Sequence, residues 1–248
     1  MTTMMMCGRG VRKALMGAAL AILVVPGLAQ AQSTIFNIPS TDTVSPGKGY
    51  VEFDYLAQLP KADFGAWQIF APRGVVGVSP QMEVGVNLAV SHVGDGGGNS
   101  TIFQPNAKYK FFADDDAGVA ASAGVIGYFV SDGGDKFGQV YGNVSKKTKS
   151  GARVTAGAYA ALSCDACDGT ANKVGAILGY EQPITGKVSF VADWLSGKNF
   201  WGYFTPGISA VLPHNGLLNI GYSIGNDSFS NNDLKNRALF VYYGITFP

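Results

Sequence analysis

Charged side chains recur in this chain at alternate positions of otherwise apolar segments, and opposite charges fall where two neighbouring segments could pair them. Glu83 begins one such segment and Lys110 ends the next, and Arg153 and Glu181 stand in the same relation. Opposite charges on neighbouring strands of one sheet face stabilise each other. If the segments are antiparallel strands, the sequence predicts three such pairs: Glu83–Lys110, Arg153–Glu181 and Lys173–Asp193.

Two interpretations of these charges are open. They either only neutralise one another inside a barrel, or they line a pore and set its field, as rings of charged side chains do in channels. Glu52 and Asp54 have no obvious cationic partner on the next segment, so they could attract cations, bind a solute, or be neutralised across the lumen by Lys108. The candidate lumen-lining side chains are Glu52, Asp54, Glu83, Asn87, Lys108, Lys110, Arg153, Lys173, Glu181 and Asp193.

The two histidines do not support a catalytic site. We expect His92 at the outer end of the third strand and His214 in a periplasmic turn, on opposite sides of a membrane. Neither has a serine or carboxylate beside it at the spacing of a nucleophile and its base, which a barrel hydrolase would need. The sequence therefore predicts no enzyme, no catalytic residue, no metal site and no cofactor.

A Cys-x-x-Cys motif, Cys164 to Cys167, falls in a polar connection. In a cytosolic protein this spacing could be redox-active or half of a zinc site. Here the remaining cysteine, Cys7, precedes the apolar run at the start of the chain. A chain that crosses an oxidising compartment favours a disulfide, so we expect Cys164 and Cys167 to staple a loop.

The start of the chain has the pattern of a secretory signal peptide. Arg9, Arg12 and Lys13 precede an apolar run at residues 14–25, and Ala29-Gln30-Ala31 is a small-x-small cleavage site. The run is too short to span a membrane as a helix, so we expect residues 1–31 to be removed. The mature chain would then carry 15 basic and 17 acidic side chains, which argues against a nucleic-acid partner.

Alternation of apolar and polar residues predicts an all-β chain of about 12 strands. The last segment is the most informative, with Leu239, Val241, Tyr243, Ile245 and Phe247 on one face, the pattern of strands in transmembrane β-barrels. The expected strands cover about 49–57, 66–78, 83–91, 106–111, 118–130, 139–146, 153–162, 173–181, 188–194, 202–212, 218–224 and 239–247.

The connections between these segments alternate in length. Those after even-numbered segments are tight turns, such as 79–81 and 213–216, and those after odd-numbered segments are longer or richer in Gly, Asp and Asn. Short periplasmic turns and longer outer loops are typical of outer-membrane barrels. A soluble β-sandwich also alternates, but its polar face would carry more charge than the Gly, Ser and Asn found here. We therefore expect an antiparallel up-and-down transmembrane barrel at residues 47–248.

Twelve strands predict a narrow passage, because barrels of about eight strands are filled and those of 16 to 18 are open. The inward positions have few bulky residues beyond Ile126, Tyr128, Tyr159 and Phe240. Residues 32–46 are rich in Ser, Thr and Pro and could be a periplasmic segment or a plug. A carrier for apolar solutes would need four aromatic residues to cluster at an opening, although interfacial girdles explain them more simply: Trp67, Phe200, Trp201 and Phe204.

Four motifs, at Ile38–Thr43, Asp193–Lys198, Gly202–Gly207 and Gly221–Asn226, resemble those of small, largely uncharacterised bacterial outer-membrane barrels. These barrels are similar in style to porin-like proteins of aromatic-degradation operons. The resemblance implies the barrel fold and a bacterial outer-membrane location, and it offers no binding residues.

The expected function is porin-like passage of small polar or weakly charged solutes. The alternative is a closed structural barrel whose loops contact lipopolysaccharide or other cells. Expected partners are outer-membrane lipids, lipopolysaccharide, the barrel-assembly machinery and the solutes.

Overall fold

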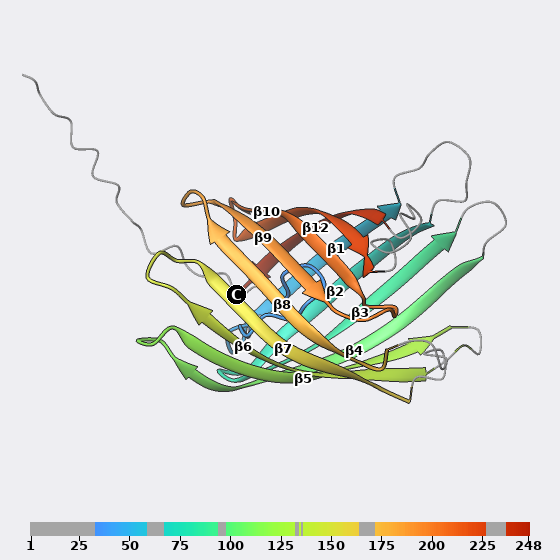
Figure 1. Cartoon of the computed structure of the whole chain (residues 1–248), viewed down its shortest axis with the longest axis horizontal. Helices are drawn as coiled ribbons and strands as arrows, with labels where there is room; N and C mark the ends of the chain where they lie inside the picture. Colours follow the sequence, from blue (N-terminus) through green and yellow to red (C-terminus); the bar gives the residue numbers. More distant parts are fainter. Residues whose placement is uncertain are drawn as a thin grey trace, which may run out of the picture.

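The computed structural model describes residues 33–58, 67–93, 98–131, 134, 136–163, 172–226 and 237–248. They form a closed antiparallel barrel of twelve strands (Figure 1), which confirms the predicted fold class. The strands are β1 Gly49–Gln58, β2 Trp67–Ser79, β3 Met82–Val93, β4 Asn99–Asp114, β5 Val119–Val130, β6 Lys136–Lys147, β7 Arg153–Leu162, β8 Val174–Pro183, β9 Val188–Leu195, β10 Tyr203–Leu212, β11 Gly216–Gly225 and β12 Arg237–Phe247. The expected signal peptide (1–31) and the Cys164–Cys167 disulfide lie outside the described residues.

Each strand pairs with its neighbours in sequence, and β1 closes the barrel by pairing with β12 from Gly49↔Phe247 to Gln58↔Ala238. The short connections follow even-numbered strands, as predicted, and emerge at one end, which we call the turn end. The other, the loop end, carries the longer connections. β4 starts well before the expected residue 106. The sequence did not show its first half because the polar residues Asn99, Ser100 and Gln104 interrupt the alternation of apolar and polar positions. Among the described residues, no helix is long and apolar enough to cross a membrane.

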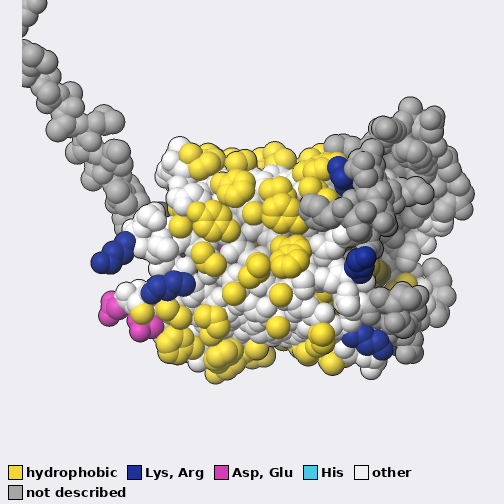
Figure 2. All heavy atoms as spheres, in the orientation of Figure 1, with side chains coloured by type: hydrophobic (Ala, Val, Ile, Leu, Met, Phe, Trp, Pro, Cys, Tyr) yellow, Lys and Arg dark blue, Asp and Glu magenta, His cyan; other side chains and the backbone are white. Residues whose placement is uncertain are grey.

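The outer wall of the barrel is apolar. Val51 and Phe53 of β1 are each 49% exposed, and Val86, Leu88 and Ile220 are exposed in the same way on other strands. Figure 2 shows hydrophobic side chains spread over the visible wall, with charged ones near its two ends. This surface follows from the two-residue period of a strand, which sends alternate side chains outward.

Residues 33–46, here called the N-terminal segment, run inside the barrel. At the turn end Pro46 forms a parallel bridge with Gly77 of β2, and the Gly47 N–H donates to the Gly77 carbonyl at 3.0 Å. A Cβ at position 77 would lie 2.2 Å from the Val44 carbonyl oxygen. The close approach of the segment to β2 therefore requires glycine there.

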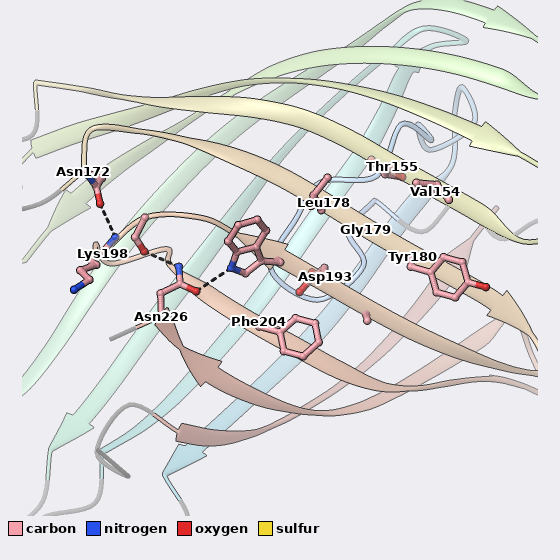
Figure 3. A pocket seen from close by; sticks show the side chains of 13 residues that line it. Val154, Thr155, Asn172, Leu178, Gly179, Tyr180, Asp193, Lys198, Phe204 and Asn226 are labelled. Atoms are coloured by element: carbon pink, nitrogen blue, oxygen red, sulfur yellow. Dashed lines mark hydrogen bonds between the residues drawn. The ribbon is translucent and has the colours of Figure 1, made fainter. Parts of the chain in front are cut away.

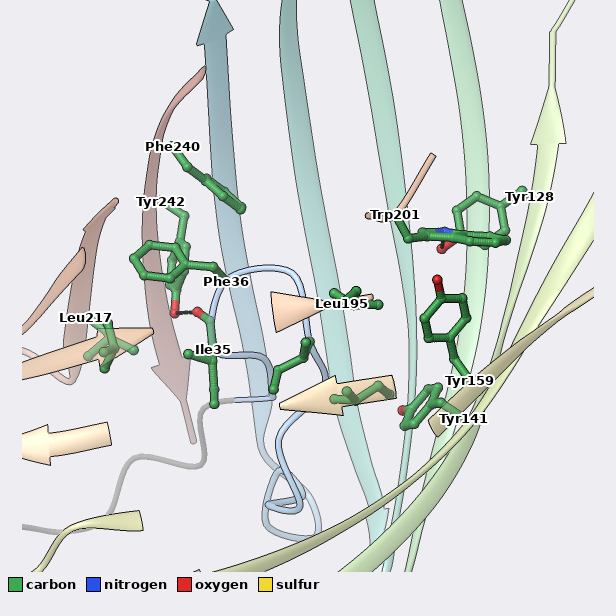
Figure 4. Packing of buried hydrophobic residues seen from close by; sticks show 13 residues of the cluster. Ile35, Phe36, Tyr128, Tyr141, Tyr159, Leu195, Trp201, Leu217, Phe240 and Tyr242 are labelled. Atoms are coloured by element: carbon green, nitrogen blue, oxygen red, sulfur yellow. Dashed lines mark hydrogen bonds between the residues drawn. The ribbon is translucent and has the colours of Figure 1, made fainter. Parts of the chain in front are cut away.

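The lumen holds more bulky side chains than the sequence predicts. Tyr128, Tyr159 and Phe240 do point inward and are buried. They belong to one buried cluster that also includes Tyr141, Ile177, Val191, Leu195, Trp201, Leu217 and Tyr242 (Figure 4). The expectation of few bulky residues at inward positions is wrong because strand residues such as Tyr141, Ile177 and Tyr242 also point inward. Ile35, Phe36 and Ile38 of the N-terminal segment pack against them, so the lumen is packed as a core.

Candidate functional site

The N-terminal segment is anchored to the barrel wall by Asp193 of β9. One carboxylate oxygen of Asp193 accepts the backbone N–H groups of Phe36 at 2.8 Å, Asn37 at 2.6 Å and Ile38 at 3.0 Å. The other oxygen accepts the Asn37 side-chain amide at 3.0 Å. Three successive N–H groups around one oxygen form the concave anion site that backbone turns provide. This carboxylate therefore holds the turn of the segment in place.

The expected Lys173–Asp193 pair is wrong. The β8–β9 register places Asp193 opposite Gly179, and Lys173 lies exposed before the first residue of β8. The sequence pattern identified Asp193 as a lumen residue but gave no indication that a backbone turn, rather than a lysine, would neutralise it.

Glu52 of β1 has a cationic partner on β2 that the sequence analysis missed. Arg73 lies directly opposite Glu52, and its Nη1 is 3.2 Å from the Glu52 carboxylate. The Tyr50 hydroxyl also donates to Glu52. Arg73 then reaches the N-terminal segment, donating to the hydroxyls of Thr34 and Ser33 at 2.9 Å each. Arg73 could have been found from its parity on β2, which it shares with buried Ala71 and Val75.

Glu83 of β3 pairs with Lys108 of β4 at 3.0 Å, not with Lys110 as expected. The register joins Glu83 to Lys108, and the backbone N–H of Lys110 bonds the Gln81 carbonyl beyond the strand end. Lys108 and Lys110 share one parity of β4, so the alternation of side chains does not decide which of them meets Glu83. Lys108 is committed to Glu83 and Ser33, so it does not neutralise Glu52 across the lumen.

Glu83 and Lys108 also hold the N-terminal segment at two separate points. The Ser33 hydroxyl and the Val44 backbone N–H donate to Glu83, the latter at 2.8 Å. Lys108 Nζ donates to the Ser33 carbonyl at 3.0 Å. Both ends of the segment are therefore tied to one buried ion pair.

Arg153 of β7 lies opposite Glu181 of β8, as the strand pattern predicts, and its Nη2 donates to Glu181 at 2.8 Å. Arg153 also forms an ion pair with Asp42 of the N-terminal segment. Burial raises the pKa of the Asp42 carboxyl, but the charge and hydrogen bond of Arg153 outweigh it and hold the pKa below its usual value of 3.8. Arg153 is therefore shared between the wall and the segment.

Glycines on the inner wall receive the apolar side chains of the segment. A Cβ at Gly179 would lie 2.7 and 2.8 Å from the side-chain ends of Ile38 and Ile35. At Gly221 a Cβ would lie 2.7 Å from the ring of Phe36. The wall and the segment are thus complementary in shape as well as in charge.

Every strand contributes a lumen-facing side chain that is at most 9% exposed, and together they form what we call the sealing layer around the N-terminal segment. Its members are Glu52, Arg73, Glu83, Lys108, Ser122, Asn143, Thr155, Ile177, Asp193, Thr205, Asn219 and Tyr242, in strand order. Since these side chains are almost inaccessible to water, the lumen around the N-terminal segment is packed in this conformation.

A cavity of about 380 Å³ lies on the loop side of the sealing layer. We call it the outer vestibule; Phe36 and Asn37 of the segment contribute to its lining, together with Asp54 and Asn87. Asn87 donates to Gln104 and accepts from Asn106, both at 3.3 Å. The remaining lining residues are Leu56, Trp67, Ile69, Ala71, Ala89, Gln104, Tyr128, Leu195, Asn199, Phe200, Trp201, Tyr203 and Phe240.

The assignment of four aromatic residues to interfacial girdles is wrong for three of them. Trp67, Phe200 and Trp201 line the outer vestibule, and Trp201 donates to the Tyr128 hydroxyl at 2.9 Å. Trp67 has the inward parity of β2, and the loop after β9 carries Phe200 and Trp201 over the lumen. Only Phe204 faces outward.

Phe204 lines a larger groove of about 870 Å³ on the outer face of β7 to β10 (Figure 3). Its walls are apolar, with Leu178, Tyr180 and Trp194, and Trp194 donates to Asn226 at the loop-end rim at 2.9 Å. Thr155, Gly179 and Asp193, which belong to the inward parity of β7 to β9, also border this groove. Most of the other lining residues face outward, so the outer vestibule and the sealing layer remain the candidate site.

No family model matches this chain, and no curated protein matches it. Among solved structures, the chain is similar to a protein from work on the in-meso crystallization of membrane proteins, with 10% identity and a TM-score of 0.47 over 80% of this chain and 83% of that one. A likeness of this degree carries no argument about function. The resemblance to porin-like barrels stays a prediction.

Proposed function

We propose that this protein spans a bacterial outer membrane and acts as a porin-like channel that its own N-terminal segment closes. The observation that carries the proposal is the sealing layer, in which wall side chains from twelve strands surround a segment that is not part of the wall. An apolar outer wall on a closed barrel supports the membrane location, because closure leaves no unpaired strand edge facing lipid. Small polar or weakly charged solutes would pass when the segment moves.

The contacts of the segment suit a reversible closure. They include the Asp193 anchor, the Arg153–Asp42 ion pair and the hydrogen bonds of Ser33. Water can replace each of these groups when the segment leaves, so the net free energy of each contact is only about 1–3 kcal/mol. Together these contacts keep the lumen closed. Each one is weak enough that the segment can leave and return.

Replacing the anchor tests the proposal. Asp193→Ala leaves the backbone N–H groups of Phe36, Asn37 and Ile38 without their acceptor. We expect planar bilayers to show a rise of about tenfold or more in the open fraction, for a destabilisation of the closed state by about 1.4 kcal/mol or more. Asp116→Ala, in an exposed turn, is the matched control and should behave as wild type.

The closed lumen also favours a second candidate, a structural barrel whose loops contact lipopolysaccharide or other cells. In that case the N-terminal segment is a permanent part of the core, and its contacts only stabilise the fold. Asp193→Ala would then lower the melting temperature without producing conductance. Outer-membrane lipids and the barrel-assembly machinery are proposed partners under both candidates, and neither involves an enzymatic reaction.

A further inference from the structure

The outer vestibule is lined by several aromatic side chains and by one carboxyl group. Its described lining includes Trp67, Phe200, Trp201 and Tyr203 and one ionisable carboxylate, Asp54. No lysine, arginine or histidine is among the described residues that line it. Its volume of about 380 Å³ falls in the range of small-molecule sites.

Asp54 lies in the same buried cluster as the Glu52–Arg73 ion pair. Arg73 hydrogen-bonds Glu52 and Lys108 pairs with Glu83. One oxygen of Asp54, Oδ1, is buried and has no hydrogen-bond partner among the described residues. Asp54 is thus the carboxyl group of this cluster with an oxygen atom that has no partner among the described residues.

Aromatic rings enclose the cavity from several directions. Phe36 and Phe240 lie on one side of the lumen, and Trp201 and Tyr128 on the other (Figure 4). Phe200 packs edge-on against Trp201 with ring centroids 6.0 Å apart. The faces of such rings attract cations, most strongly when the cation has little hydration to lose.

We propose that the outer vestibule binds a small organic cation, of the class of aromatic or alkyl ammonium compounds, with the ammonium group at Asp54 and the apolar part against Trp67, Trp201 and Phe200. This inference rests on the proposed channel function, in which the vestibule would be the first binding site for solutes arriving at the loop end. An anionic solute of the same size has no basic partner among the described lining residues.

Calorimetric titration of the purified full-length barrel in detergent tests the inference with three probes of similar size. They are benzyltrimethylammonium, the neutral benzyl alcohol and the anion benzoate. We expect measurable binding of the cation, weaker binding of the alcohol and none of benzoate. Asp54→Asn should weaken binding of the cation at least about tenfold and leave that of the alcohol within about twofold.

Two further variants separate the contributions of charge and shape. Trp67→Leu should weaken binding of both the cation and the alcohol, because both would contact this ring. Asp116→Asn, in an exposed turn, should leave both affinities unchanged. Heat-dependent migration of each variant on gels, compared with wild type, establishes that the barrel has folded. Equal affinity for cation and benzoate, or an unchanged cation affinity in folded Asp54→Asn, would overturn the assignment.

The conductance of Asp193→Ala distinguishes failure of this inference from failure of the channel. If that variant conducts but the cation does not bind, the channel stands and the vestibule ligand is wrong. If cation binding is found without conductance in any variant, the vestibule is a binding site in a closed barrel.

Discussion

Single side chains of the wall hold the N-terminal segment, and the Asp42–Arg153 pair shows how directly pH acts on such a contact. The pKa of Asp42 lies below 3.8 because Arg153 stabilises its charged form more than burial disfavours it. A carboxyl whose pKa is lowered in the folded state stabilises that state above its usual pKa. That contribution is lost as the pH falls through the lowered value.

We therefore expect Asp42→Asn to lower the melting temperature at pH 7, where wild type has the full ion pair. The difference between the two proteins should shrink as the pH falls below 3.8, because wild-type Asp42 then becomes neutral as well. Circular dichroism melting curves in detergent measure both temperatures. Asp116→Asn, which changes an exposed carboxylate of a turn, should show no such difference. A gap between wild type and Asp42→Asn that is constant with pH would show that the pair does not stabilise the fold.

At the scale of elements, the segment and the wall fit by shape. Phe36 packs where Gly221 of β11 has no side chain, and a Cβ there would lie 2.7 Å from its ring. We expect Gly221→Val to displace the segment and raise conductance. Adding Phe36→Ala should restore closure, because the smaller side chain leaves room for valine. Additive effects of the two substitutions would mean that this contact does not position the segment.

The strands themselves could be predicted from the sequence, because their side chains alternate and the connection lengths alternate with them. The exact register could not, because a shift of two residues keeps the same side chains facing inward. Lys108 and Lys110 share one parity, so the alternation does not show which of them meets Glu83, whereas the predicted Arg153–Glu181 pair is the one found.

The contacts of the N-terminal segment also lay beyond prediction. A segment rich in Ser, Thr and Pro has no regular repeat of apolar residues, so the sequence does not show which of its side chains are buried or what they pack against. Its one signal was the apolar group of Ile35, Phe36 and Ile38 within otherwise polar sequence. The glycines that receive these residues, at 179 and 221, read in the sequence only as small lumen positions.

For the whole molecule, the alternation of loops and turns sets the orientation in the membrane. The connection after β7 belongs to the loop end and the one after β10 to the turn end. We expect an epitope tag inserted after Asp168 to be labelled on intact cells and one after Asn215 only after permeabilisation. Labelling of both on intact cells would contradict the transmembrane barrel, and labelling of only the second would reverse its orientation.

Closure of the lumen by the N-terminal segment is tested most directly by removing that segment. Single-channel recordings in planar bilayers should compare the full mature barrel with one that lacks residues 32–46, after both are shown to have folded. We expect rare, brief openings from the full barrel and a steady ohmic conductance from the shortened one. In the shortened barrel the wall side chains of the sealing layer surround an empty lumen. A folded, shortened barrel that gives no conductance would contradict the channel, and equal steady conductance from both would show that the segment does not close it.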